Sequence, residues 1–307
     1  MTSPAKLVRV VRTAGLCVLR QLRLEEALLR APAEAGNWAV VNDGARTPAI
    51  VLGISGKPHA LIDVARAHAD GVLVLKRFTG GGTVIVDEDT QFVSLLMRRD
   101  ALPPDVPLFP EPLMRWTAAL YGGGGGRASG TPPVSIDPPR RTPLASAAVF
   151  RDVPGWRLRE NDYAVGDLKI GGNAQSVAKD RFVHHTSFLW GFDPRRMRYL
   201  RNPEKQPRYR GRRDHDAFLT TLRAIGFETR ATLPERLPAA IRAMGMETTE
   251  ATLEELEAAA RGWGGLGSAA RRTTAVVDLA AALEMGVDAR APVMSAEEEA
   301  RFFRKRE

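Results

Sequence analysis

The sequence predicts an α+β fold built on an antiparallel or mixed β-sheet with helices around it. The chain has 307 residues, of which 44% are hydrophobic, and this is enough to bury a large core. Its first third contains several short apolar runs joined by tight connections, a pattern that does not suggest regular βαβ winding. The part after residue 215 is instead rich in Ala, Glu and Leu, which indicates helices.

Hydrophobic periodicity and turn signals place the individual elements. Residues 7–11 alternate as in a strand, and residues 19–29 have near-helical spacing that ends before Ala31-Pro32. Asn42-Asp43-Gly44 is expected to form a turn. Further strands are expected at residues 49–54, 72–77, 84–86, 91–97, 156–165, 168–170 and 182–189, and helices at 63–69 and 114–121.

One segment interrupts this pattern. Residues 122–148 contain five consecutive glycines and Pro-Pro pairs, and such a composition buries too little apolar surface to offset its ordering entropy. We expect a disordered surface insertion there. The glycine run lacks the flanking strand and the Lys-Ser or Lys-Thr pair of a phosphate-binding loop. We expect residues 1–230 to form the domain that carries the chemistry and residues 231–307 to form a helical C-terminal extension.

Composition narrows the classes of function. The net charge is +8, but the arginines are scattered and are not interleaved with aromatic residues, so a solvated basic surface is favoured over a nucleic-acid site. No apolar run approaches the roughly 20 residues that span a bilayer, and we expect a soluble protein without membrane contact. The single cysteine, Cys17, lies in an apolar stretch and is interpreted as a buried hydrophobe. The arginine-rich start resembles a transit peptide, although the first elements of the fold are favoured, so mitochondrial and cytoplasmic locations both stay open.

A glycine-rich segment between two expected strands is the first candidate site. Thr79-Gly80-Gly81-Gly82-Thr83, called the glycine loop below, follows Arg77 directly after one strand. Glycines let a backbone approach a ligand closely, and their N–H groups can converge on an anion. Arg77 adds a planar cationic fork suited to a phosphate or carboxylate. A flexible hairpin is the alternative, because glycine-rich turns are common.

Two later segments add further polar residues. Asn161-Asp162 precedes Lys169, which begins a strand just before Gly171-Gly172-Asn173. In a pocket, such a lysine is a point charge for a phosphate or a carbonyl oxygen; otherwise it is an exposed strand lysine. His184 and His185 are adjacent in a strand and face opposite sides, so we expect one at the surface and one in the core or a pocket, and no metal site.

Together these three segments resemble the lipoate–protein ligase family. The family pattern has basic residues before Ser or Thr and three glycines, then Asn-Asp, a Lys-Ile-x-Gly-x-Ala strand and a His-His strand, and all occur here in that order. The resemblance implies a class II biotin/lipoate ligase-like catalytic domain, with a central mixed sheet flanked by helices. It also implies ATP, Mg²⁺ and lipoate as cofactors or substrates. The implied acceptors are lipoyl domains of 2-oxoacid dehydrogenase subunits or of glycine cleavage H protein.

The resemblance also implies roles for individual residues. Lys169 matches the family's lysine, which contacts the acyl-adenylate, and Val84 and Phe188 are expected beside the acyl chain. The residues expected to bind lipoyl-AMP or ATP are Arg77, Thr79, Gly80, Gly81, Gly82, Thr83, Asp87, Asn161, Asp162, Gly172, Asn173 and His185.

Two departures from the family keep alternatives open. Val86-Asp87 stands where the family usually has His-Asp, and no family-like accessory domain is visible after residue 230. The chain is expected to form lipoyl-AMP or to use it preformed. An octanoyltransferase with a cysteine thioester is one alternative, disfavoured because only Cys17 is present. A non-enzymatic binding or scaffold protein on the same fold is the other.

Overall fold

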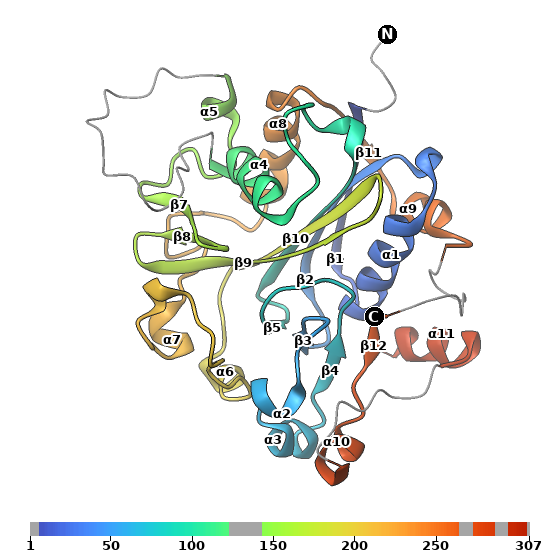
Figure 1. Cartoon of the computed structure of the whole chain (residues 1–307), viewed down its shortest axis with the longest axis vertical. Helices are drawn as coiled ribbons and strands as arrows, with labels where there is room; N and C mark the ends of the chain where they lie inside the picture. The colour runs from blue at the N-terminus through green and yellow to red at the C-terminus, as the bar shows by residue number, and fades with distance from the viewer. Residues whose placement is uncertain (1–5, 123–142, 264–272, 286–293, 306–307) are drawn as a thin grey trace.

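A mixed eight-stranded sheet forms the centre of the protein. The computed structural model describes residues 6–122, 143–263, 273–285 and 294–305 (Figure 1). The strand order is β11-β1-β2-β6-β10-β9-β8-β7, with β1 parallel to both β11 and β2 and the other pairs antiparallel. The expected mixed sheet is therefore confirmed. The strands are β1 (Leu7–Gly15), β2 (Asn37–Ala45), β6 (Thr90–Arg98), β7 (Trp156–Arg159), β8 (Asp162–Val165), β9 (Leu168–Val177), β10 (Arg181–Leu189) and β11 (Glu247–Ala251).

A smaller four-stranded sheet packs beside the large one. Its order is β12-β4-β3-β5, formed by β3 (Ala49–Leu52), β4 (Leu73–Lys76), β5 (Val84–Val86) and β12 (Ala275–Val276). Side chains alternate across its strands, as the pleat requires. Val51 joins the cluster that packs on the large sheet, whereas Ile50 and Leu52 join a separate cluster with Ile62 and Val74.

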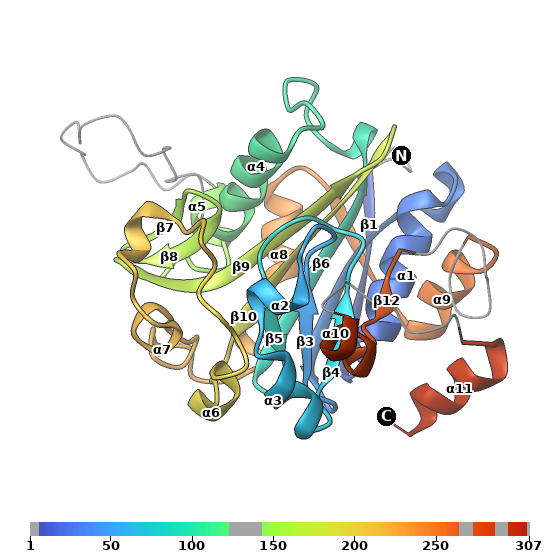
Figure 2. The ribbon, with the colours of Figure 1, turned by 60° about the horizontal axis from the view of Figure 1, so that its bottom comes forward.

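Helices cover both sheets, as Figures 1 and 2 show. On one face of the large sheet lie α4 (Pro110–Gly122) and α8 (Thr232–Ala243); on the other lie α1 (Val18–Arg30) and α9 (Leu253–Ala260). The outer face of the small sheet is covered by α2 (Pro58–Leu61), α3 (Val64–Ala69) and α10 (Leu279–Met285). The remaining helices are η2 (Ala33–Ala35), η3 (Arg99–Ala101), α5 (Pro143–Ala147), α6 (Pro194–Met197), η4 (Arg208–Arg210), α7 (His215–Phe218) and α11 (Ala296–Arg304). None of the described helices is long and apolar enough to cross a membrane.

The turn expected at Asn42-Asp43-Gly44 is wrong, because β2 continues to Ala45. Asn42 is buried, and its side chain accepts a hydrogen bond from the Leu16 N–H (3.2 Å) and donates one to the Leu16 carbonyl (2.9 Å). Gly44 has φ +86°, which lets the strand bend without ending. Within this polar tripeptide, Asn42 thus links β2 by hydrogen bonds to the residues just before α1.

The segment after residue 230 is built into both sheets and is not purely helical. Within it, β11 pairs with β1 of the large sheet, and β12 pairs with β4 of the small sheet. The buried carboxylate of Glu26 on α1 accepts hydrogen bonds from the backbone N–H groups of Thr273 (2.6 Å) and Thr274 (3.0 Å). These hydrogen bonds lower the Glu26 pKa, although burial alone acts to raise it. The expected boundary at residue 230 therefore does not separate two packing units.

Both ends of the expected insertion, residues 122–148, belong to the fold. Gly122 ends α4, residues 143–147 form α5, and Ala148, Val149 and Phe150 are buried. The central part, residues 123–142, lies outside the described residues. The C-terminal end of the segment is thus part of the fold, because α5 packs against α8.

We predict that two deletions in this region differ in their effect on stability. Replacing residues 123–142 by a short linker should leave the thermal midpoint within a few degrees, since loop closure entropy changes by only about 0.6 kcal/mol per doubling of length. Extending the deletion through Ala148 removes α5 and a buried residue, so the midpoint should fall clearly further. Circular dichroism melts of both variants test this, and equal midpoints would contradict it.

Candidate active site

A buried arginine forms hydrogen bonds with several residues of the glycine loop. Arg77 donates from Nε to Thr79 Oγ1 (2.8 Å) and from Nη1 to the Val51 carbonyl (3.1 Å). Its Nη2 donates to the carbonyls of Gly80 (3.0 Å) and Gly82 (2.7 Å). Burial lowers the Arg77 pKa to about 10. The fork therefore contacts backbone carbonyls of the protein in this structure, and its expected contact with an anion stays a prediction.

A chain of buried polar groups continues from this arginine. Thr79 Oγ1 lies 3.1 Å from His185 Nε2, and His185 Nδ1 lies 3.0 Å from Glu25 Oε2. The other Glu25 oxygen accepts hydrogen bonds from Gln21 Nε2 (3.0 Å) and from the Ser94 hydroxyl. Both ring nitrogens of His185 are therefore engaged inside the protein. Thr79 and His185 thus connect the glycine loop to α1, and their expected contacts with a ligand stay predictions.

Both histidines of the His184-His185 pair are buried, so the expectation that one lies at the surface is wrong. Elements pack on both faces of β10, and His184 faces the side covered by α4. Its Nε2 lies 3.4 Å from the Tyr163 hydroxyl and 3.3 Å from Thr186 Oγ1. Burial lowers the His184 pKa to about 3, and neighbouring His185 adds to this shift. His184 is therefore neutral in the folded protein at neutral pH.

This lowered pKa predicts a loss of stability in acid. The unfolded chain takes up a proton on His184 below its ordinary pKa of 6.5, whereas the folded chain does so only near 3. The contribution of the neutral His184 side chain to the free energy of unfolding is fully present above pH 6.5. It is lost as the pH falls toward 3, by at most about 1.4 kcal/mol per pH unit. Urea unfolding between these limits should show a flatter pH dependence for His184→Gln than for the exposed control His59→Gln. Equal slopes would contradict the prediction.

The glycine loop lies against strand β9. The Gly80 N–H donates to the Gln175 carbonyl (3.1 Å). Gly81 has φ +106°, and a Cβ there would lie only 2.8 Å from the Asn173 carbonyl oxygen. A side chain at position 81 is therefore excluded by both backbone conformation and space. Gly81 and Gly82 are exposed beside β9, where their backbone is accessible to a ligand.

Lys169 lies near the start of β9 and forms an ion pair with a carboxylate on β8. Its Nζ lies 2.7 Å from Asp162 Oδ1, and Asp162 Oδ2 accepts a hydrogen bond from the Tyr209 hydroxyl (2.9 Å). The Lys169 side chain is 23% exposed, whereas that of Asp162 is 8% exposed. Burial and the Asp162 charge raise the Tyr209 pKa, so this hydroxyl keeps its proton. The ammonium is thus fixed at one side, with further N–H groups left for a ligand.

Lys169 lines a small cavity of about 80 Å³ between the two sheets. The end of the glycine loop and β5 form one part of the lining, β9 and β10 form another, and residues between α6 and the end of α7 form the rest. Apolar side chains dominate the lining, with Lys169, Arg210 and His215 as its basic groups. The lining residues are Thr83, Val84, Ile85, Lys169, Ile170, Gly171, Gly172, Ser187, Leu189, Met197, Leu200, Arg210, His215, Phe218 and Leu219.

The expected catalytic residue Lys169 lines this cavity, together with two of the expected ligand-binding residues, Thr83 and Gly172. Val84 does so too, but Phe188 packs in the core beneath the other face of the sheet. Asp162 lies directly behind Lys169.

Asp87, Asn161 and Asn173 do not line the cavity. Asp87 is buried in the turn after β5 and forms an ion pair with Arg196 (2.7 Å). Asn173 donates to the Asn161 carbonyl (3.1 Å) and so connects β9 to the turn before β8. These residues stabilise the surroundings of the site.

Three residues of the lining carry no motif in the sequence. Arg210, His215 and Phe218 lie in a stretch that reads as a polar, basic loop followed by helix. Burial lowers the His215 pKa to about 4, and the nearby charges of Arg210 and Lys169 add to this effect. Only the mixture of aromatic residues and arginines at positions 208–218 could have drawn attention to them.

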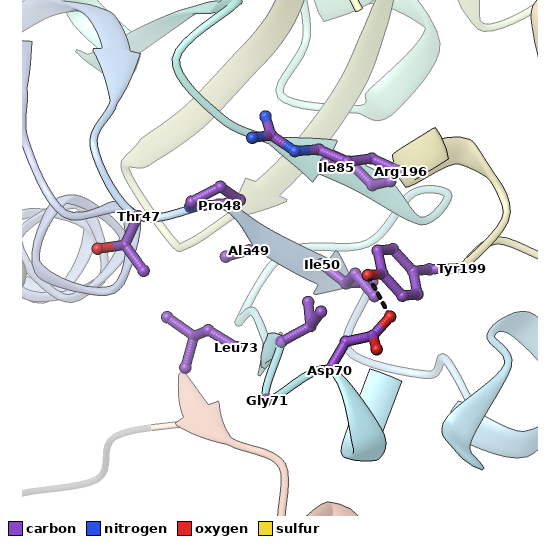
Figure 3. A pocket seen from close by; sticks show the side chains of 11 residues that line it. Thr47, Pro48, Ala49, Ile50, Asp70, Gly71, Leu73, Ile85, Arg196 and Tyr199 are labelled. Carbon is purple, nitrogen blue, oxygen red and sulfur yellow. Dashed lines mark hydrogen bonds between the residues drawn. The ribbon is translucent and has the colours of Figure 1, made fainter. Parts of the chain in front are cut away.

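A second cavity, of about 250 Å³, lies on the other side of Ile85 (Figure 3). The Tyr199 hydroxyl donates to Asp70 Oδ2 (2.7 Å) at its edge, and Arg196 lies across from them. None of the expected ligand-binding residues lines it. The larger cavity is therefore not the one that the sequence motifs assemble.

The residues around Lys169 do not fit a protein-held Mg²⁺ site. Among the described residues, no group of three His, Cys, Asp or Glu side chains is placed to hold a metal ion. Asp162 is the carboxylate beside Lys169, and its oxygens are engaged by Lys169 and Tyr209. Mg²⁺ often binds through substrate phosphates and water, and such an ion would have to arrive with a nucleotide.

Comparisons with known proteins agree with this fold and these motifs. The family model "Lipoyl protein ligase A/B catalytic domain" matches residues 18–235. A Plasmodium falciparum (isolate 3D7) protein named "Inactive lipoate--protein ligase 2" is 30% identical over 200 residues, which cover 61% of this chain and 50% of that protein. This chain thus spans half the length of that curated relative.

Two solved structures share the fold at low sequence identity. Lipoate-protein ligase A bound with ATP has a TM-score of 0.57 at 17% identity, over 83% of this chain and 92% of that chain. The bi-partite lipoate protein ligase studied with its E2 lipoyl domain from Thermoplasma acidophilum has a TM-score of 0.59 at 16% identity, over 82% and 90%. Because the family model covers most of the chain, including the glycine loop and Lys169, this protein belongs to the lipoyl protein ligase A/B catalytic domain family.

Proposed function

We propose that this chain is a lipoate–protein ligase-like acyltransferase. It forms or uses lipoyl-AMP and passes the lipoyl group to a lysine of an acceptor lipoyl domain, such as that of a 2-oxoacid dehydrogenase subunit or glycine cleavage H protein. The observation that carries the proposal is the position of Lys169, which is fixed by Asp162 at the wall of a cavity that also contains the end of the glycine loop.

The charges of the cavity favour an anionic ligand. Lys169 and Arg210 supply positive charge, and Asp162 supplies a negative charge that is already paired. Negative charge develops on oxygen when lipoate attacks the α-phosphate of ATP and again when an amine attacks the acyl carbonyl. A preorganised ammonium lowers both barriers, because it needs no reorganisation as the charge forms. Val84, Ile85 and Met197 offer apolar contacts for the acyl chain.

The cavity must open for such a ligand. Its volume of about 80 Å³ is well below the roughly 300–1,000 Å³ of typical ligand pockets. The segment between α6 and α7 forms part of its lining through Leu200 and Arg210. We propose that this segment moves outward to admit lipoyl-AMP, whereas α7 keeps its place beside Lys169 through the bridge between Leu219 and Lys169.

Similar proteins support this proposal. One structural relative was solved with ATP, and another belongs to a bi-partite ligase studied with an E2 lipoyl domain. The name of the Plasmodium relative, which says that it is inactive, favours a second candidate function. In that case the chain binds the acyl-adenylate or the lipoyl domain without turnover.

Mass spectrometry of an apo lipoyl domain separates these functions. The domain is incubated with the protein and either ATP plus lipoate or synthetic lipoyl-AMP. A ligase adds one lipoyl mass in both reactions, and a transferase that needs preformed lipoyl-AMP adds it only in the second. No added mass in either reaction, together with binding of lipoyl-AMP, would support the non-enzymatic function. Absence of both transfer and binding would contradict the proposal.

An octanoyltransferase would need Cys17 as its nucleophile, whereas the proposed ligase-like reaction does not. The residue is 1% exposed and packs in the hydrophobic cluster around α1, so we expect Cys17→Ser to retain acyl transfer. Single-turnover transfer by the variant and the wild type should proceed at similar rates. Complete loss of transfer with an unchanged circular dichroism spectrum would instead favour a thioester intermediate.

A further inference from the structure

His215 lines the same cavity as the end of the glycine loop and is coupled to the strand of Lys169. Leu219, four residues on, forms a β-bridge with Lys169, and the Thr220 N–H donates to the Lys169 carbonyl (2.8 Å). The Leu219 N–H in turn donates to the His215 carbonyl (3.0 Å). Through these bonds, α7 and β9 place the imidazole of His215 and the ammonium of Lys169 on the same cavity.

The electrostatic surroundings keep this imidazole uncharged. Burial lowers the His215 pKa to about 4, and the positive charges of Arg210 and Lys169 act in the same direction, against the carboxylates of Asp214 and Asp216. Among the described residues that line the cavity, Lys169 and Arg210 are the other nitrogen bases; Lys169 is ion-paired with Asp162, and a guanidinium does not give up its proton in proteins. His215 is therefore the lining side chain able to accept a proton.

The proposed reaction requires such a group. A lysine side chain has an ordinary pKa of about 10.4, so an acceptor lysine arrives almost entirely as an ammonium, which has no lone pair with which to attack. The cations of the cavity disfavour that ammonium and promote release of its proton. Asp162 is poorly placed to receive it, because Lys169 and Tyr209 engage its oxygens.

We propose that His215 receives the proton of the attacking lysine, an inference that rests on the proposed acyl transfer. One proton passes from the ammonium to the imidazole, and the freed amine nitrogen forms a bond to the acyl carbon. The bond between that carbon and the phosphate oxygen breaks, and its electron pair leaves with AMP. The second N–H proton of the new amide nitrogen is lost to solvent. The negative phosphate of the bound adenylate offsets Lys169 and Arg210, and so makes His215 a stronger base when it is needed.

The test compares two nucleophiles with one acyl donor. Single-turnover release of AMP from lipoyl-AMP is measured with an apo lipoyl domain and, separately, with hydroxylamine, which is largely unprotonated near neutral pH and needs no base to remove a proton before it attacks. His215→Asn should slow transfer to the lipoyl domain by about 10²-fold or more and leave transfer to hydroxylamine unchanged. His59→Asn, at an exposed position away from the cavity, is the matched control and should change neither rate.

The pH dependence gives a second readout that a merely structural role would not change. In the wild type, lysine and imidazole share one proton, so the rate should be nearly flat around neutral pH. In His215→Asn the proton must go to solvent, and the rate should rise about tenfold per pH unit. An equal loss with both nucleophiles, or no loss with either, would overturn the role of His215 while leaving the proposed function intact. Absence of wild-type transfer to the lipoyl domain would overturn both.

Discussion

Replacing Lys169 by methionine is expected to slow acyl transfer by about 10²-fold or more, because removal of one oxyanion donor typically costs roughly 2.7–4 kcal/mol. Methionine keeps an apolar stem of similar length but lacks the charge. Lys169→Arg should not restore the full rate, since a planar guanidinium differs in shape from a compact ammonium. The measurement is single-turnover lipoylation of an apo lipoyl domain, started with ATP plus lipoate or with lipoyl-AMP.

The ion pair with Asp162 requires a control in this experiment. Lys169→Met removes the cation from the Asp162 carboxylate, which is 8% exposed and keeps the hydrogen bond from the Tyr209 hydroxyl. Loss of one partner of a buried ion pair lowers stability as well as activity. The double variant Lys169→Met/Asp162→Asn removes the buried charge and should recover the stability without recovering the rate. Loss only with ATP would confine Lys169 to adenylation. Wild-type rates from the single variant in both assays would show that Lys169 is not the central residue.

Replacing Arg77 by methionine is expected to destabilise the fold by about 3–5 kcal/mol, the usual effect of removing one partner from a buried charged network. The carbonyls of Val51, Gly80 and Gly82 would each lose a donor. Arg77→Lys should recover little, because an ammonium cannot reproduce the geometry of the fork. Urea unfolding followed by circular dichroism measures the free energy of unfolding.

A surface arginine provides the matched control for this prediction. The Arg66 side chain is 47% exposed and lies 4.0 Å from Asp63, so Arg66→Met should change the free energy of unfolding by no more than about 0.5 kcal/mol. If Arg77→Met keeps wild-type stability but no longer binds nucleotide, Arg77 contacts the ligand directly, as the sequence alone suggested.

Local patterns in the sequence predicted most strands and the segments that form the candidate site. Residues 84–86 and 182–189 are strands as expected, and the glycine loop and Lys169 meet at one cavity. Each of these inferences depends on neighbours in sequence, such as a run of β-branched residues or a lysine just before paired glycines. Such signals are reliable because they report the local conformation of the backbone and do not depend on distant residues.

Roles that depend on distant partners were beyond the reach of the sequence. Arg77 looked like an anion-binding residue because nothing in its own segment shows that the carbonyls of Val51 and Gly82 surround it. His185 looked available for a ligand because Glu25, its partner, lies 160 residues away in the chain. His215 carried no recognisable motif, and its importance follows from the cavity that it shares with Lys169.

A crystal structure with a non-hydrolysable lipoyl-AMP analogue would test the central claim most directly. We expect the phosphate of the analogue within hydrogen-bonding distance of Lys169 Nζ, the acyl chain along Val84 and Ile85, and the segment between α6 and α7 displaced. An analogue seated instead in the larger cavity beside Asp70 and Tyr199, away from Lys169, would contradict the assignment of the active site.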